Sequence, residues 1–215
     1  MRQLLKENRF FLLPYFLVLL ICGILLLILS KPELHIFSNN AHSTFSDYFF
    51  KYATYLGDGL MILIITIVLL FVKYRYSIIF LSGSLITGGI INLFKKVLLE
   101  DVFRPSKYFE LYETYQLHFI EGVNLHAFNS FPSGHTGTAF NVFFMFALIS
   151  KNKVHKLFFF VVAALVGYSR VYLSQHFLID ITVGSIFGTS IIFLMFWLIS
   201  KSNKKWLDYS LIDRK

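Results

Sequence analysis

Long apolar runs alternate with short polar stretches along this chain of 215 residues. A helix needs about 20 apolar residues to cross a hydrocarbon core about 30 Å thick. Six runs reach or approach that length, so the pattern predicts an all-α bundle of six membrane-spanning helices, in a single membrane domain over residues 1–215. The predicted helices are Phe10–Ser30, Tyr52–Val72, Tyr76–Phe94, Thr136–Ser150, Leu157–Leu173 and Phe177–Ser200. The fourth is short and needs help from its flanks or a local thinning of the bilayer.

The composition supports a membrane protein. Hydrophobic residues make up 56% of the chain and charged residues 15%, whereas a soluble domain carries about 25% charged residues. The first run follows Arg2, Lys6 and Arg9, as a signal peptide would, but it is too long for the apolar part of one and lacks a small-residue cleavage site. We therefore expect a retained helix. The single cysteine, Cys22, excludes an internal disulfide.

The positive charges predict the orientation of the bundle. The net charge of +8 lies in short clusters between apolar runs, which is typical of membrane loops and not of a nucleic-acid-binding surface. With both termini in the cytoplasm, 13 of the 20 Lys and Arg residues fall on the cytoplasmic side and 7 on the other. This bias predicts a multi-pass protein of the cell (inner) membrane with cytoplasmic termini. The long segment 95–134 then offers room for a site on the outer, or periplasmic, side.

Three clusters of polar residues fall on that outer side. In one of them, His176 and Asp180 are four residues apart at the start of a helix, so they share one face. The carboxylate can accept a proton from one imidazole nitrogen, which fixes the tautomer and leaves the other nitrogen free to attack. Arg170 ends the preceding helix, and a short turn can bring its planar guanidinium over the same site to bind a phosphoryl group.

The second cluster is Pro132-Ser133-Gly134-His135, at the entry to the fourth helix. A helix N-terminus presents free N–H groups and a positive dipole end, both of which suit phosphate. Gly134 allows the backbone to approach a ligand closely. The Ser133 hydroxyl can cap the helix or donate to a phosphate oxygen. His135 is placed to give a proton to a leaving oxygen.

The remaining cluster follows the third helix and contains Lys95, Lys96, Arg104 and Pro105. It adds cations to the same surface, and Pro105 stiffens the chain after Arg104. Several cations, a helix N-terminus and two histidines together fit phosphoryl transfer by positioning and charge neutralisation.

In these motifs the chain resembles the type 2 phosphatidic acid phosphatases, whose site is shared with the vanadium haloperoxidases. That family carries Lys, six residues and Arg-Pro; then Pro-Ser-Gly-His; then Ser-Arg, five residues, His, three residues and Asp. Residues 131–135 and Ser169-Arg170 with His176 and Asp180 match in full. The first motif departs, because seven residues, Val97 to Phe103, separate Lys96 from Arg104.

The extra residue leaves the phosphate-binding lysine open. We assign it to Lys96 and expect the surplus residue to bulge out of the segment Val97–Phe103, which Glu100 and Asp101 make polar. Lys95 stays an alternative, because one residue of helix turns a side chain by about 100°.

The resemblance implies a role for each matching residue. His176 would be the nucleophile that forms a phospho-histidine, Asp180 would orient it, and His135 would be the general acid for the leaving alcohol. The phosphate would be held by Lys96, Arg104, Ser133, Gly134 and Arg170. The family needs no metal, and no metal-ligand spacing is visible here, so we expect no cofactor.

The expected substrate is an amphiphilic phosphate monoester or diphosphate, because the site lies where lipid headgroups lie. The candidates are phosphatidic acid, phosphatidylglycerol phosphate, undecaprenyl diphosphate and the phosphates of lipid A. The sequence does not distinguish among them, and it does not indicate an oligomeric state. Two other functions are open. A vanadate-dependent haloperoxidase has no need of spanning helices. A non-catalytic transporter or scaffold of the same fold would be expected to lose His176, Asp180 or Arg170, and all three are present.

Two polar residues have no clear place in this picture. Asp58 lies between Gly57 and Gly59 near the outer end of the second helix. We expect it to make a structural hydrogen bond, with a role near the site as the alternative. We expect His126, in the long outer loop, to be a surface residue.

Overall fold

Helices carry most of the chain in the computed structural model, which describes residues 1–212. No strand occurs in these residues, so the predicted all-α class is confirmed. The helices are α1 (Arg2–Glu7), α2 (Arg9–Ile28), α3 (Lys31–Asn40), α4 (Thr44–Ala53), the 3₁₀ turn η1 (Thr54–Gly57), α5 (Gly59–Val72), α6 (Tyr74–Leu93), the π-helical turn η2 (Phe94–Leu98), α7 (Pro105–Tyr112), α8 (Gly134–Ile149), α9 (Lys153–Tyr172), α10 (Leu178–Ile199) and the 3₁₀ turn η3 (Lys205–Asp208).

Each predicted apolar run contains a helix, but the predicted count of six spanning helices is not exact for residues 1–212. Four segments are long and apolar enough to cross a membrane: α2, α6 with η2, α9 and α10. The predicted second span, Tyr52–Val72, is broken near Asp58, where α4–η1 and α5 meet at an angle of 57° and count together as a fifth candidate. The predicted fourth span is α8, which has 16 residues and falls below spanning length.

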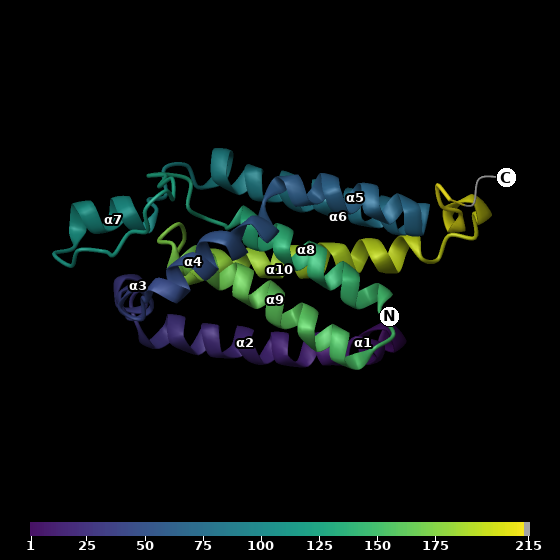
Figure 1. Cartoon of the computed structure of the whole chain (residues 1–215), viewed down its shortest axis with the longest axis horizontal. Coiled ribbons are helices and arrows are strands. Elements are labelled where there is room, and N and C mark those ends of the chain that lie inside the picture. The colour runs from purple at the N-terminus through teal and green to yellow at the C-terminus, as the bar shows by residue number, and fades with distance from the viewer. Residues whose placement is uncertain (213–215) are drawn as a thin grey trace.

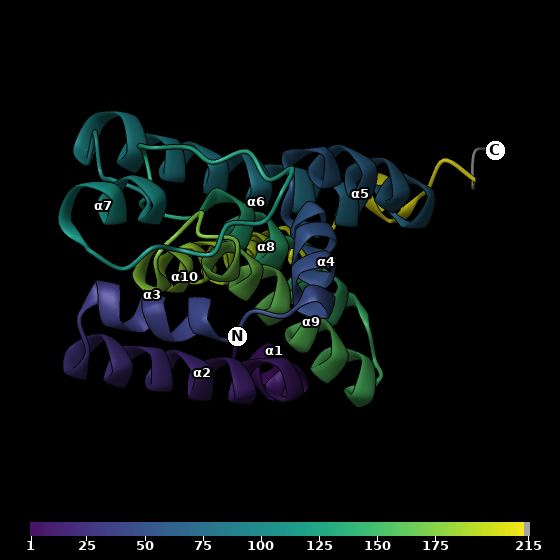
Figure 2. The ribbon, with the colours of Figure 1, turned by 60° about the vertical axis from the view of Figure 1, so that its left-hand side comes forward.

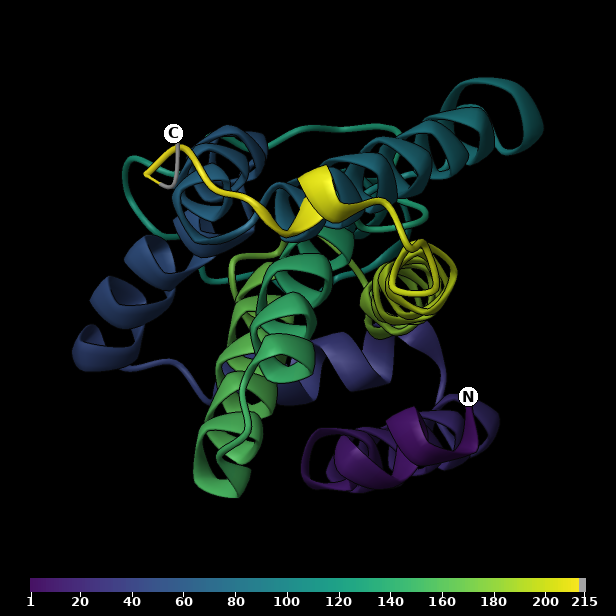
Figure 3. The ribbon, with the colours of Figure 1, turned by 90° about the vertical axis from the view of Figure 1, so that its right-hand side faces the viewer.

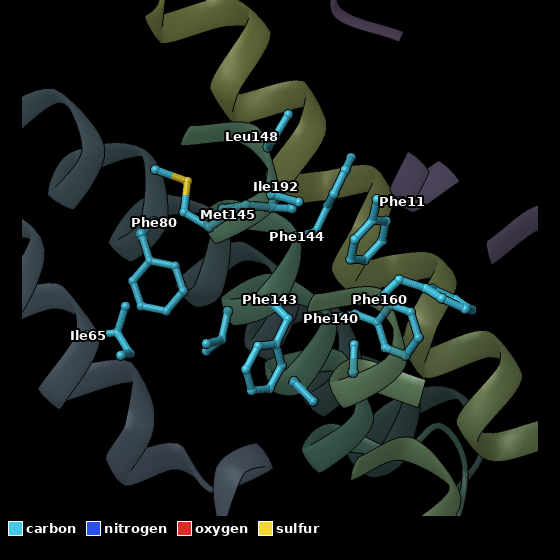
Figure 4. Close-up of a cluster of buried hydrophobic side chains, with 14 of the residues drawn as sticks. Phe11, Ile65, Phe80, Phe140, Phe143, Phe144, Met145, Leu148, Phe160 and Ile192 are labelled. Carbon is cyan, nitrogen blue, oxygen red and sulfur yellow. The ribbon is translucent and has the colours of Figure 1, made fainter. Parts of the chain in front are cut away.

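The short helix α8 lies at the centre of the bundle. It packs against α5, α6, α9 and α10, and its buried residues face all sides. Figure 3, a view along the bundle, shows α8 and α9 passing between α2 and the pair α5 and α6. Aromatic rings fill the space around it: Phe11 of α2 stacks on Phe144 with ring centroids 4.6 Å apart and meets Phe160 of α9 edge-on at 5.7 Å (Figure 4).

Glycines let α10 lie directly on the first turns of α8. A Cβ atom on Gly184 would stand 2.5 Å from the carbonyl oxygen of Ser133, and one on Gly188 would stand 2.5 Å from that of Gly137. Real Cβ atoms do not approach so closely, so any side chain at either position would push the helices apart. Small residues four apart are a common means of close helix packing in membranes. This contact places the start of α10 beside the N-terminus of α8.

The two ends of the bundle differ in what they carry. The short helices α3 and α7 and the long α7–α8 connection lie at one end, and α1 and η3 lie at the other (Figure 1). Figure 2 shows α4 running from α9 towards α5. The hydropathy pattern did not predict α3, although Ser30 and Glu33 form a capping box at its start, with the Ser30 N–H donating to the Glu33 carboxylate at 2.8 Å.

Candidate active site

Three clusters that lie far apart in the sequence meet at the end of the bundle that carries α3 and α7. They line an open cleft with a volume of about 340 Å³. Six residues singled out from the sequence line it: Lys95, Arg104, Gly134, His135, Arg170 and His176. Lys51 adds a fourth Lys or Arg to the lining, and Asp58 is the one carboxylate among the lining residues. The cleft is therefore positively charged, as an anion-binding site should be.

His176 and Asp180 form a buried pair behind the cleft. Nδ1 of His176 lies 3.3 Å from Oδ2 of Asp180, and each side chain is 2% exposed. The same carboxylate oxygen accepts hydrogen bonds from the Ser130 hydroxyl at 2.5 Å and from the Phe177 N–H at 2.9 Å. These bonds hold the carboxylate still and direct it at Nδ1. Nε2 of His176 has no hydrogen-bond partner among residues 1–212.

Burial controls the protonation of His176, which lies in the loop between α9 and α10. Removal from water lowers the pKa of its imidazole, and the carboxylate of Asp180 opposes this shift only in part. The two guanidinium groups of Arg104 and Arg170 lower this pKa further. The neutral imidazole is thus favoured at neutral pH, and its free nitrogen carries the lone pair that a nucleophile needs.

Arg170 lies in the last turn of α9, with its guanidinium largely unused by the protein. The side chain donates from Nη1 to the Thr54 hydroxyl at 2.6 Å, and its buried Nε has no partner within the described residues. A buried donor without an acceptor is costly. An anion bound in the cleft would remove that cost, since a guanidinium offers several N–H groups to one phosphate.

Arg104 is fixed from two sides. Its Nε donates to the Phe128 carbonyl at 2.9 Å, and its Nη1 donates to the side-chain oxygen of Gln175 at 3.1 Å. Gln175 in turn donates to the Asn124 carbonyl at 2.8 Å, which ties the long α7–α8 connection to the turn before α10. Gln175 and Asn124 also line the cleft. Neither stood out in the sequence, because their role depends on contacts between distant segments.

Ser133 acts as the N-cap of α8 in this geometry. Its hydroxyl accepts from the Thr136 N–H at 3.3 Å and from the Thr136 hydroxyl at 2.9 Å. The residue is fully buried and does not line the cleft, whereas Gly134 and His135 do. Of the two roles considered for Ser133, the structure shows capping, and the contact with phosphate stays a prediction.

The structure places Lys95, and not the predicted Lys96, at the cleft. Lys95 lines the cleft together with Arg104 and His135. Lys96 is exposed and does not line it. Eight residues therefore separate the lysine of the cleft from Arg104, two more than in the family pattern.

Local backbone geometry explains how the two surplus residues are accommodated. The chain leaves α6 through the π-helical turn η2, which contains Lys95 itself. A π-helical turn holds one more residue than an α-helical turn and is frequent at functional sites. Further along, Asp101 takes a left-handed conformation with φ of 61°. The expected bulge in Val97–Phe103 is thus partly right, but the register change begins earlier.

Asp58 belongs to the site, which the sequence suggested only as the less favoured alternative. Its Oδ2 lies 3.7 Å from Nε2 of His135, while its Oδ1 accepts from the Leu60 N–H at 2.9 Å and caps α5. Gly57 makes this possible, since a Cβ there would stand 2.6 Å from the carbonyl oxygen of His135. The break between α4 and α5 therefore rests on the start of α8. His126 is exposed, as expected, and it also lines the cleft.

No group of three or more His, Cys, Asp or Glu side chains in residues 1–212 is arranged to hold a metal ion. The cations of the cleft are instead the groups placed to meet negative charge. The expectation of a reaction without a cofactor stays a prediction.

Comparison with known proteins places this cleft in a family. The family model described as the PAP2 superfamily matches residues 76–204, more than half of the chain. The chain belongs to the PAP2 superfamily. The match runs from α6 to just beyond α10, so it includes Lys95, Arg104, His135, Arg170 and His176. Thr54 and Asp58, which also line the cleft, precede residue 76 and so lie outside the matched residues.

Two solved structures share the fold of this PAP2 superfamily member. LpxE of Aquifex aeolicus is 24% identical with a TM-score of 0.66, over 77% of this chain and 93% of that one. The first transmembrane PAP2-type phosphatidylglycerolphosphate phosphatase from Bacillus subtilis is 23% identical with a TM-score of 0.64, over 90% and 98%. No curated protein matches the chain in sequence. The apolar helices and these neighbours indicate a multi-pass membrane protein.

Proposed function

We propose that this protein is a membrane phosphatase that removes a terminal phosphate from a lipid by way of a phospho-histidine on His176. The observation that carries the proposal is the buried His176–Asp180 pair, which leaves Nε2 free beside a cleft lined by four Lys and Arg side chains. Membership of the PAP2 superfamily and its two membrane neighbours support a lipid phosphatase.

The first chemical step forms the phospho-enzyme. Nε2 of His176 attacks the phosphorus atom, the P–O bond to the leaving group breaks, and His135 gives its proton to the leaving oxygen. Asp180 holds the imidazole through Nδ1 and stabilises the positive charge that develops on the ring. Lys95, Arg104 and Arg170 neutralise the phosphoryl oxygens, which carry the charge of the transition state.

The second step releases inorganic phosphate. A water molecule attacks the phosphorus, the now neutral His135 takes a proton from it, and the P–N bond to His176 breaks. His135 thereby regains the proton it lost, and His176 regains its lone pair. One residue serves as acid and then as base, as reversibility of the proton transfer requires.

A lipid suits the surroundings of the cleft better than a soluble phosphate. A second cavity of about 230 Å³ lies between α5, α6 and α8 and shares Lys95, Gly134 and His135 with the cleft. Its lining includes Gly59 and Gly88, where an added Cβ would meet nothing within 4 Å. An acyl or prenyl chain can lie in this space while its phosphate occupies the cleft.

The proposal is tested by phosphate release from a panel of purified lipids. Phosphatidic acid, phosphatidylglycerol phosphate, undecaprenyl diphosphate and a lipid A phosphate would each be presented in mixed micelles, beside the water-soluble glycerol phosphate. We expect release from at least one lipid and a much lower kcat/KM for glycerol phosphate. Release from none, by folded protein, would contradict a phosphatase and favour a non-catalytic membrane protein. Equal rates of phosphate release from lipid and soluble phosphates would show that the substrate need not be a lipid.

Activity should survive chelation. The Lys and Arg side chains of the cleft supply the charge that a divalent metal would otherwise supply. We expect the initial rate of phosphate release to be unchanged after treatment with EDTA and desalting. A loss of rate that magnesium or zinc restores would show that the reaction needs a metal.

Replacement of Asp58 by Asn should weaken the proton donation by His135. Burial and the charges of Arg170, Lys95 and Arg104 lower the pKa of the His135 imidazole. The Asp58 carboxylate, 3.7 Å from Nε2, opposes this shift and favours the imidazolium form that the proposed mechanism needs. Without it we expect kcat for an alkyl phosphate to fall by about tenfold, and the alkaline limb of the pH–rate profile to move to lower pH. An aryl phosphate such as p-nitrophenyl phosphate needs little help from an acid, so its kcat should change much less. An equal loss for both substrates would indicate a purely structural role for Asp58.

We further propose that the cleft faces the outer, or periplasmic, side of the cell membrane, as the distribution of Lys and Arg predicts. On a Cys22→Ser background, Tyr112→Cys marks the end with the cleft and Asn203→Cys the opposite end; both positions are exposed. In intact cells an impermeant maleimide should label the first and spare the second. The reverse labelling pattern would place the cleft in the cytoplasm.

A further inference from the structure

A second large cleft lies at the opposite end of the bundle from the candidate active site. It is formed by α1, the start of α2, the start of α6, the end of α8 and the start of α9, and its volume is about 840 Å³. Lys156 in this cleft and Arg170 in the other are both on α9. They are fourteen positions apart, which is about 21 Å along a helix axis. In a membrane, the two clefts therefore face opposite leaflets.

Unpaired positive charge distinguishes this second cleft. Five cations line it, from α1, α2, the α8–α9 connection and α9: Lys6, Arg9, Lys151, Lys153 and Lys156. Glu7 is the one acid in the lining, and its carboxylate accepts from Gln3 at 2.9 Å. Within residues 1–212, none of the five cations lies within 4 Å of an Asp or Glu oxygen. One carboxylate among five cations leaves the cleft with a net positive charge.

Lys156 shows that the arrangement is more than a solvated charged surface. The residue is 4% exposed, and its ammonium group donates to the side-chain oxygen of Asn8 at 2.6 Å. Asn8 is itself 1% exposed and carries no charge. A buried ammonium is costly unless an anion is near. Positive charges that merely set the orientation of a membrane protein need only be at the surface.

The cleft is also apolar on one side, as an amphiphilic ligand requires. Phe10, Tyr76, Leu148 and Ile149 line it beside the cations. The Phe10 ring lies under two of the charges, with the Arg9 guanidinium 5.1 Å and the Lys153 ammonium 5.6 Å from its centre. Exposed apolar side chains of α2, among them Leu13, Phe16 and Leu17, continue from this end along the bundle.

We propose that this cleft binds the phosphate headgroup of an anionic phospholipid from the leaflet opposite the candidate active site, with the acyl chains lying along the apolar surface of α2. Clustered Lys and Arg side chains at a membrane surface attract anionic lipid headgroups. The site is separate from the catalytic cleft, and the lipid is retained there and not hydrolysed. The inference does not depend on the proposed phosphatase activity.

The test compares two charge-matched double variants of the full chain. Lys6→Gln with Lys153→Gln removes two exposed cations from the cleft; Lys204→Gln with Lys205→Gln removes two exposed cations at the same end but outside it. Each protein would be titrated in phosphatidylcholine-containing micelles with phosphatidylglycerol, and bound lipid counted by native mass spectrometry. We call Lys6→Gln with Lys153→Gln the cleft pair and Lys204→Gln with Lys205→Gln the control pair. We expect the wild type and the control pair to retain phosphatidylglycerol. The affinity for phosphatidylglycerol should fall about tenfold or more in the cleft pair.

Three further outcomes distinguish a built lipid site from diffuse surface charge and from a site for free phosphate. Equal losses of affinity for phosphatidylglycerol in the two pairs would show that only general surface charge matters. No loss of affinity in the cleft pair would show that the cleft does not bind the lipid. Either result would overturn the proposal. Displacement of the lipid by inorganic phosphate at comparable concentration would show a site for free phosphate instead. If the cleft pair does not purify as a folded protein, Arg9→Gln with Lys151→Gln gives a second pair, which should show the same loss. Lipid bound in the catalytic cleft would be equal in all the variants.

Discussion

Replacement of His176 by alanine should abolish turnover. No other group in the described structure pairs a free imidazole nitrogen with a buried carboxylate at the cleft, so no phospho-enzyme can form without it. Loss of a catalytic nucleophile costs about three orders of magnitude or more. Phosphate release from the best lipid of the panel, followed at saturating substrate, is the measurement. A variant that retains more than about a tenth of the wild-type kcat would show that His176 is not the nucleophile.

The matched control for this experiment is His126→Ala. His126 lines the same cleft, but the structure uses only its backbone, whose carbonyl accepts from the Ser106 hydroxyl at 3.2 Å. Removal of the His126 imidazole should leave kcat close to wild type. If both histidine variants lose activity equally, the loss reflects damage to the cleft and not a missing nucleophile.

Removal of Lys95 should be the next most damaging change, and removal of its neighbour Lys96 should matter little. Lys95 lines the cleft with Arg104 and His135, so its charge can stabilise the phosphoryl oxygens as the P–O bond breaks. The loss of one such preorganised group lowers kcat by about a hundredfold. We expect this loss in Lys95→Ala, measured on the lipid substrate, and a partial recovery in Lys95→Arg.

Lys96→Ala is a strict control, since it removes the same charge one residue away. Lys96 is exposed outside the cleft, so its loss should at most raise KM by weakening attraction to an anionic substrate. A kcat defect in Lys96→Ala with a near-normal Lys95→Ala would identify Lys96 as the phosphate-binding lysine and show that the π-helical turn rearranges when substrate binds.

The apolar pattern predicted the positions of the long helices well, because burial in lipid demands uninterrupted apolar residues. It failed where the backbone changes direction. The run Tyr52–Val72 reads as one span, but Gly57 and Asp58 break it so that the chain can rest on His135. The helices α3 and α7 are too polar for a hydropathy signal. Their starts were readable all the same, from the capping box at Ser30 and from Pro105 in the first turn of α7.

The parts of the candidate site that could be predicted are those whose residues lie close together in the sequence. His176 and Asp180 are only four residues apart, so their pairing could be predicted directly, although His176 precedes α10 and does not lie on the helix as expected. The choice between Lys95 and Lys96 could not, since a π-helical turn leaves no distinct mark in the sequence. Thr54 and Gln175 were missed as site residues, and Asp58 was given a place near the site only as an alternative, for a different reason. Their partners are contributed by segments far away in the chain, and only the folded bundle brings them together.

The shortness of α8 has a consequence for hydration. Its 16 residues span about 24 Å, whereas a hydrocarbon core is about 30 Å thick. The central helix of the bundle is therefore about 6 Å shorter than a full-length span, and His135 lies in its first turn. On the proposed mechanism, the open cleft at this end of α8 gives the water that completes hydrolysis a path that does not cross hydrocarbon. On the same proposal, the lipid tail lies in the separate cavity between α5, α6 and α8, away from that water.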